Sequence, residues 1–138
     1  MSTKDKEIKE SFKGNKYTVT HCKGAMDSLE KALKHVTKSK ADSLINGLAV
    51  QIERLAEGHR MSNKNFPSEG NLPKQSSTKK FRALKRLPVR GYCWLSDKNK
   101  DTYYISHYIY KDQKKLSDKD TEIVGKNWKR IEVNGDEC

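Results

Sequence analysis

The stretch KKFRALKRLPVRGYCWLSDKNKDTYYISHYIYK, residues 79–111, decides the second half of the fold. It contains three runs rich in aromatic, β-branched and other apolar residues, at positions 80–87, 91–96 and 102–111, and each is typical of a β-strand. The segment 97–101 between the last two runs has the Asp and Asn content of a hairpin turn. Because the connections are short, we expect the three strands to form an antiparallel meander.

Upstream of this stretch, the sequence predicts a strand and two helices. Residues 17–22 have the β-branched and aromatic content of a strand. Ser39 and Asp42 resemble a capping box at the start of the second helix, and Gly58 is a natural C-terminal stop. Apolar residues at steps of three and four define one face of each helix: Met26, Leu29, Ala32, Leu33 and Val36, then Ala41, Leu44, Ile45, Leu48, Ile52 and Leu55. The short connection folds them back as a helical hairpin.

The remaining segments complete an α+β fold. Residues 59–78 are rich in Pro, Gly, Ser and Asn and predict a long loop. A final helix begins at Ser117, with Asp118 and Asp120 in its first turn. We therefore expect an N-terminal strand and helical hairpin packed on a small antiparallel sheet with a C-terminal helix. Residues 16–134 form a single domain in this interpretation, with a flexible basic tail at 1–15 and a terminal tail at 135–138.

The composition favours an acidic partner. The 138 residues carry a formal net charge of +11, which suits a nucleic acid or an acidic protein better than a membrane surface. The cysteines Cys22, Cys93 and Cys138 are odd in number and lack metal-ligand spacing, so we expect reduced thiols in a cytoplasmic protein. The first residues are charged rather than apolar, and no apolar run reaches transmembrane length.

Basic and aromatic residues alternate between positions 79 and 111, which suits a surface that binds RNA. The candidates for phosphate contacts are Lys79, Lys80, Arg82, Lys85, Arg86, Arg90 and Lys111. The alternative is an edge strand whose lysines only keep it soluble. Tyr92 and Trp94 are candidates for base stacking, and the alternative for both is ordinary core packing.

His107 is the acid–base candidate, because histidine exchanges protons near neutral pH. Strand alternation predicts that His107 shares one face with Ile105 and Ile109, while Tyr108 and Tyr110 share the other. His107 is either an accessible catalytic group or a packed structural histidine. In the second case the two tyrosines remain as proton donors or stacking platforms. His21, His35 and His59 receive no functional assignment.

The order of elements resembles the RelE/ParE superfamily of bacterial toxins, most closely its HigB branch. The local match covers residues 81–128, and its motifs are RGYCWLSDK at 90–98 and YISHYIYKDQKK at 104–115. The resemblance implies a cytoplasmic endoribonuclease that cleaves mRNA in the ribosomal decoding site and needs no metal or other cofactor. In this reaction the ribose 2′-hydroxyl attacks the adjacent phosphate. It also implies a partner antitoxin with a helix-turn-helix DNA-binding region.

On this interpretation the candidate catalytic residues are His107, Tyr110, Arg90 and Arg82. The candidate RNA-binding residues are Lys79, Lys80, Lys85, Arg86, Lys111, Tyr92 and Tyr108. Two alternatives stay open: a ParE-like inhibitor of DNA gyrase, and a basic nucleic-acid-binding module without enzymatic activity.

Overall fold

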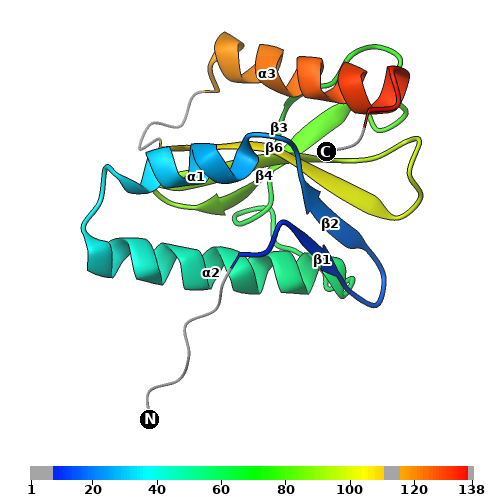
Figure 1. Ribbon diagram of the computed structural model, residues 1–138. Helices are drawn as coiled ribbons and strands as arrows, with labels where there is room; N and C mark the ends of the chain where they lie inside the picture. Colours follow the sequence, from blue (N-terminus) through cyan, green and yellow to red (C-terminus); the bar gives the residue numbers. More distant parts are fainter. Residues whose placement is uncertain (1–7, 111–115, 137–138) are drawn as a thin grey trace.

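The computed structural model describes residues 8–110 and 116–136, which form an α+β fold (Figure 1). The strands are β1 (Ser11–Lys13), β2 (Thr18–His21), β3 (Ser68–Asn71), β4 (Lys80–Arg86), β5 (Val89–Leu95) and β6 (Thr102–Tyr110). The helices are α1 (Ala25–Leu33), α2 (Lys38–Ala56) and α3 (Asp118–Trp128), and a π-helical turn, η1 (Lys129–Val133), extends α3.

The strands form one sheet in the order β1-β2-β6-β5-β4-β3. The meander of β4, β5 and β6 is antiparallel, as the sequence predicts. The sheet as a whole is mixed, because β2 pairs with β6 in parallel, from Thr18 opposite Thr102 to His21 opposite Ile105. A parallel pair needs a crossover connection, and the α1–α2 hairpin starts that crossover immediately after β2.

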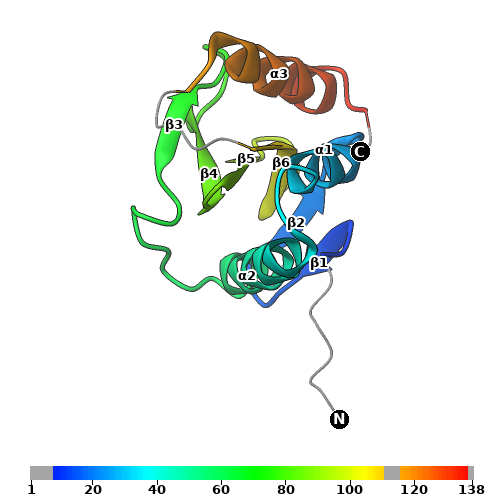
Figure 2. The same ribbon diagram turned by 90° about the vertical axis from the view of Figure 1, so that its left-hand side faces the viewer.

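Helices cover both faces of the sheet (Figure 2). The face toward α2 packs Leu48 and Ile52 of that helix against Leu84, Cys93 and Ile105 of the strands. The opposite face packs a second cluster of buried residues against α3 and η1: Cys22, Leu72, Phe81, Ala83, Tyr92, Trp94, Val124, Trp128 and Ile131. In Figure 2, α1 lies beside β6 between these two layers. Trp94 and Trp128 are therefore core residues.

The helix ends agree with the sequence except at the end of α1, which stops at Leu33 rather than continuing to Val36, and at the start of α2. The helix begins two residues earlier than the Ser39–Asp42 pair suggests, because the Thr37 hydroxyl accepts a hydrogen bond from the Lys40 backbone N–H at 3.2 Å. The predicted stop is confirmed, since Gly58 adopts a φ of 84° just after the helix. Ser117 caps α3 in the same way, accepting from the Asp120 N–H.

Two short edge strands lie where the sequence predicts none. β1 falls in the segment expected to be a tail and pairs with β2, with Phe12 opposite Val19. β3 falls in the predicted loop and pairs with the first half of β4. Both are too short and too polar to show the alternation that marks a strand, so their pairing depends on the neighbouring strand.

Glu132 holds the start of the β5–β6 hairpin. One carboxylate oxygen accepts from the Trp94 indole N–H at 3.1 Å and from the Ser96 hydroxyl at 2.6 Å. The other accepts from the backbone N–H groups of Asp97 and Lys98, at 2.9 Å and 2.7 Å. This single side chain therefore connects the C-terminal helical segment to the sheet and to the turn.

Candidate functional site

A hollow of about 440 Å³ lies beside the second half of β6 and is named here the β6 pocket. Its position follows from the sheet, because the β2–β6 register ends at Ile105. Beyond that point α1 and α3 flank the strand, and the Tyr108 backbone N–H donates to the Ser28 hydroxyl of α1 at 2.9 Å. The polar residues that line the pocket are Ser28, Lys31, His35, His107, Tyr108, Tyr110, Ser117, Lys119 and Asp120.

An irregularity in β6 changes which side chains share a face. Tyr92 is opposite His107 but the next residue of β5, Cys93, is opposite Ile105, so Ser106 is an extra residue in the ladder. As a result Ile105 and Tyr108 belong to the same core cluster on the α2 side. The prediction that Ile105 shares a face with His107 is therefore wrong, because a bulge breaks the alternation on which it rested.

His107 is buried, with 7% of its surface exposed, and both ring nitrogens are hydrogen-bonded. Nε2 lies 2.9 Å from Asp120 Oδ1, and a carboxylate can only accept, so this nitrogen carries a proton. Nδ1 lies 2.9 Å from Ser106 Oγ, which itself accepts from the Asn127 amide at 2.9 Å. The Ser117 hydroxyl donates to the other oxygen of Asp120 at 2.7 Å. His107 and Asp120 thus form a fixed proton-exchanging pair on the α3 wall of the pocket.

A second histidine, His35, lines the β6 pocket on the side of α1, opposite α3. His35, just beyond the end of α1, is exposed and stacks on the Tyr110 ring, with 4.5 Å between ring centroids and 19° between planes. Within the described part of the chain, no hydrogen bond engages either ring nitrogen of His35. Lys31 and Lys119 place positive charge at the same pocket. The arrangement therefore has a fixed acid–base pair on one side and an accessible imidazole on the other.

Sequence reasoning missed His35 and Asp120 as site residues. Asp120 had been assigned only to the first turn of the last helix, where negative charge suits the helix dipole. His35 stood alone in the sequence, without a partner at any characteristic spacing. No sequence signal connects these residues to His107, because the pocket exists only once α1 and α3 lie on either side of β6.

The Tyr108 side chain is buried, and its hydroxyl is hydrogen-bonded to His21 rather than open to the β6 pocket. The hydroxyl oxygen lies 2.7 Å from Nε2 of His21, and Nδ1 of the same histidine lies 3.0 Å from the Glu10 carbonyl oxygen. Because a carbonyl only accepts, Nδ1–H donates to it, and the Tyr108 hydroxyl donates to Nε2. Burial raises the pKa of Tyr108, and burial lowers the pKa of His21 despite opposing contributions from Glu10 and Lys9. Both groups are neutral, and the pair is structural.

The lowered pKa of His21 predicts a loss of stability in acid. The unfolded chain takes up this proton near pH 6.5 and the folded chain at lower pH, so the free energy of unfolding falls as pH drops below about 6.5. Replacing His21 by Gln is expected to flatten this dependence in urea unfolding between pH 7.5 and 5. His59→Gln, at an exposed position, is the control. An unchanged pH dependence in His21→Gln would contradict the assignment.

Arg90 and Tyr92 are buried beneath α3 and are closed to an RNA strand. Arg90 is 2% exposed, and its Nη1 lies 3.7 Å from Glu69 Oε1. Tyr92 is fully buried, with its ring centroid 5.3 Å from that of His107. Burial, followed by the negative charges of Asp120 and Glu69, raises the pKa of Tyr92 to about 12. Tyr92 packs the sheet against Val124 and Trp128 of α3, and Arg90 pairs with Glu69 of β3. The predictions of phosphate binding and base stacking do not match these positions.

The other basic candidates are dispersed over β4. Arg82 packs over the Phe66 ring and donates to the Phe66 carbonyl at 2.9 Å, and with Lys80 it lines a separate hollow of about 310 Å³. Lys79 is exposed, and Lys85 is half-buried opposite Arg90. Arg86 lies at the end of β4 against α2. Lys111 lies outside the described residues. Of these basic residues, those that the structure describes do not line the β6 pocket.

Comparisons with known protein families, with curated protein sequences and with solved structures found no match to this chain. Within residues 8–110 and 116–136, no helix has both the length and the apolar character needed to cross a membrane. In the same part of the chain, no three His, Cys, Asp or Glu side chains gather as metal ligands.

Proposed function

We propose that this chain is an endoribonuclease that cleaves mRNA by attack of the ribose 2′-hydroxyl, as the toxin of a RelE/HigB-like toxin–antitoxin pair. The observation that carries the proposal is the content of the β6 pocket. Two histidines, a carboxylate and a tyrosine come from three separate elements and surround one hollow, together with two lysines. A polyanionic substrate also suits the net charge of +11.

The reaction needs one group to accept a proton and another to donate one. In the proposed mechanism the Asp120 carboxylate, held by His107 and Ser117, takes the proton of the 2′-hydroxyl. The 2′-oxygen then bonds to phosphorus and the bond from phosphorus to the 5′-oxygen breaks. Protonated His35 gives its proton to that leaving oxygen, and the products are a 2′,3′-cyclic phosphate and a 5′-hydroxyl. Each such transfer contributes about 10²–10⁴ in rate.

In the proposed mechanism the positive charge beside the reacting phosphate comes from two lysines. The sequence had suggested Arg82 and Arg90 for this role. Lys31 and Lys119 line the pocket from α1 and α3, and both are exposed. Positive groups near the reacting phosphate stabilise the charge that develops in the transition state. Tyr110, stacked on His35, orients that imidazole at the mouth of the pocket. Arg82 and Arg90 are not part of this site.

The fold is compatible with the family resemblance. The order β2, α1, α2, β4, β5, β6, α3 is the order of elements on which the resemblance was based. A non-enzymatic RNA-binding module is the second candidate function. It is favoured by the protein hydrogen bonds at both ring nitrogens of His107, which are typical of a structural histidine.

Expression of the chain in bacterial cells, with primer extension on an abundant mRNA, tests the proposal. We expect growth arrest and discrete cleavages, and we expect the purified protein to leave 2′,3′-cyclic phosphate ends on RNA in the presence of EDTA. A frameshifted gene in the same vector is the control. Arrest without RNA cleavage would point instead to DNA gyrase or another target. RNA binding without cleavage, in cells and with added ribosomes, would establish the binding module.

A further inference from the structure

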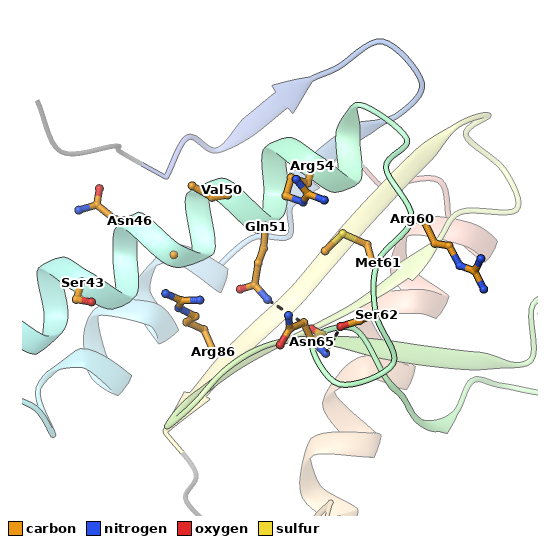
Figure 3. Close-up of a pocket in the computed structure, with 11 residues that line it drawn as sticks. Ser43, Asn46, Val50, Gln51, Arg54, Arg60, Met61, Ser62, Asn65 and Arg86 are labelled. Atoms are coloured by element: carbon orange, nitrogen blue, oxygen red, sulfur yellow. Dashed lines mark hydrogen bonds between the residues drawn. The ribbon is translucent and has the colours of Figure 1, made fainter. Parts of the chain in front are cut away.

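A second hollow, of about 750 Å³, lies between α2, the loop 60–65 and the end of β4 (Figure 3). It is named here the arginine pocket after Arg54, Arg60 and Arg86, which come from these three segments. Among the described residues that line it, none is acidic. The three arginines line one hollow without a carboxylate in its lining, which favours an anion there. Arginine suits phosphate because it donates two parallel hydrogen bonds.

Gly47 allows Arg86 to lie against α2. A Cβ atom at this buried glycine would lie 2.2 Å from Arg86 Nε and 2.6 Å from Cζ. Glycine in the middle of a helix is less favourable than alanine. At this position its lack of a side chain leaves room for the guanidinium, which Figure 3 shows reaching toward the helix. The arginine is thus held at the pocket by the shape of α2.

Gln51 adds a buried acceptor to the same pocket. The side chain is 7% exposed, and its Nε2 donates to the Lys85 carbonyl at 3.1 Å. Its Oε1 is buried and has no hydrogen-bond partner in the described part of the chain. A buried acceptor left unpaired is destabilising, so a ligand N–H that reached this oxygen would bind favourably.

The pocket therefore combines donors for a phosphate with an acceptor for an N–H group. Val50 and Met61 supply apolar surface between them. A nucleotide whose base has an exocyclic amino group matches all three features, and the volume lies in the usual range for small-molecule sites. An acidic peptide lacks the flat base.

We propose that the arginine pocket binds a nucleoside monophosphate unit with an amino-bearing base, either within an RNA strand or as a free nucleotide. The phosphate contacts the arginines, and the amino group donates to Gln51 Oε1. Arg86 pairs with Val89, which pairs with Tyr110, so one residue from each pocket lies at the same end of the sheet. The backbones of Arg86 and Tyr110 are two strand spacings, about 10 Å, apart across the sheet. Binding here does not require the chain to cleave RNA.

The test measures binding rather than cleavage, so its result is independent of the proposed nuclease activity. The probes are a fluorescein-labelled 2′-O-methyl oligoribonucleotide, which cannot react, and AMP, IMP and inorganic phosphate. AMP has an amino group at position 6, whereas IMP has a carbonyl there, which cannot donate to Gln51 Oε1, and donates only from the neighbouring N1. We expect AMP to bind more tightly than IMP, and we expect AMP to shift the NMR signals of the Gln51 side-chain amide.

Two variants assign the contacts. Arg54→Ala/Arg86→Ala is expected to weaken binding of the oligonucleotide about 30-fold and to lower its salt dependence. Lys23→Ala/Lys126→Ala removes the same charge from exposed positions outside the pocket and is expected to change affinity less than about threefold. Gln51→Leu is expected to remove the preference for AMP over IMP while the arginine-dependent affinity remains. Thermal unfolding verifies that each variant is folded.

The outcomes separate the two sources of the ligand. Arginine-dependent binding of the oligonucleotide that exceeds that of AMP identifies a strand, and the reverse identifies a free nucleotide. Equal loss of affinity in the arginine and lysine variants would overturn the proposal. Equal binding of AMP and inorganic phosphate, or arginine-dependent binding of a polyglutamate peptide without binding of either nucleotide probe, would overturn it as well.

Discussion

Replacing His35 by alanine is expected to slow RNA cleavage by about 10²-fold or more while leaving the fold intact. In the proposed mechanism His35 donates the proton that the departing 5′-oxygen needs, and loss of such a group costs about 10²–10⁴ in rate. The side chain is exposed and its main contact is the stack on Tyr110, so we expect its removal to change the free energy of unfolding by less than about 0.5 kcal/mol.

The measurement is the single-turnover cleavage rate of a short labelled RNA as a function of pH, with added ribosomes if the free protein is inactive. Because the mechanism uses a general acid, the wild-type rate should fall at high pH, and His35→Ala should lose that dependence on pH. Asp120→Asn should lose the fall in cleavage rate that the wild type shows at low pH, because an amide cannot accept the 2′-hydroxyl proton.

His59→Ala is the matched control, because His59 is also exposed but lies outside the β6 pocket. We expect it to cleave at the wild-type rate. Cleavage by His35→Ala at the wild-type rate and with the wild-type pH profile would remove His35 from the mechanism. The same result for Asp120→Asn would leave the β6 pocket without a role in catalysis.

Replacing Glu132 by alanine is expected to lower the free energy of unfolding by about 3 kcal/mol, and the melting temperature by roughly 10 °C. The carboxylate accepts four hydrogen bonds, and its removal leaves the indole N–H of Trp94, a residue that is 1% exposed, without this acceptor. A buried donor without a partner costs about 1–3 kcal/mol, and the other three bonds add to this value.

Urea and thermal unfolding measure the effect. Glu132→Gln should fall between wild type and alanine, since the amide keeps one accepting oxygen but turns its N–H groups toward donors. Glu122→Ala, on the exposed face of α3, serves as the matched control with a change within about 0.5 kcal/mol. A loss of less than about 1 kcal/mol in Glu132→Ala would show that the hairpin does not depend on this clamp.

The regular part of the fold follows from local sequence patterns. The two helices of the hairpin, the three strands of the meander and the cap at Ser117 each have their own periodicity or capping residue, and the structure confirms them. The edge strands β1 and β3 have no such pattern, because their pairing is decided by the strand beside them. The start of α2 depended on a choice between two hydroxyl residues that sequence alone does not settle.

The candidate site was predictable only in part. His107 and Tyr110 do line the β6 pocket, but the burial of Arg90, Tyr92 and Tyr108 could not be predicted from their residue types. Arginine and tyrosine in strands occur both on open surfaces and in buried polar clusters. Whether these side chains are buried or open in this protein depends on where α3 packs and on the bulge at Ser106. Both are properties of the tertiary structure.

The parallel pairing of β2 with β6 also has a kinetic consequence. The first of these strands is complete by His21, yet its partner follows only after both helices and the other two strands of the meander. Contacts between such distant segments form late, because closing a long loop costs entropy before any contact repays it. The walls of the β6 pocket come from α1, β6 and α3, so they meet only after α3 has been synthesised. A nascent chain therefore lacks an assembled β6 pocket until α3 has left the ribosome.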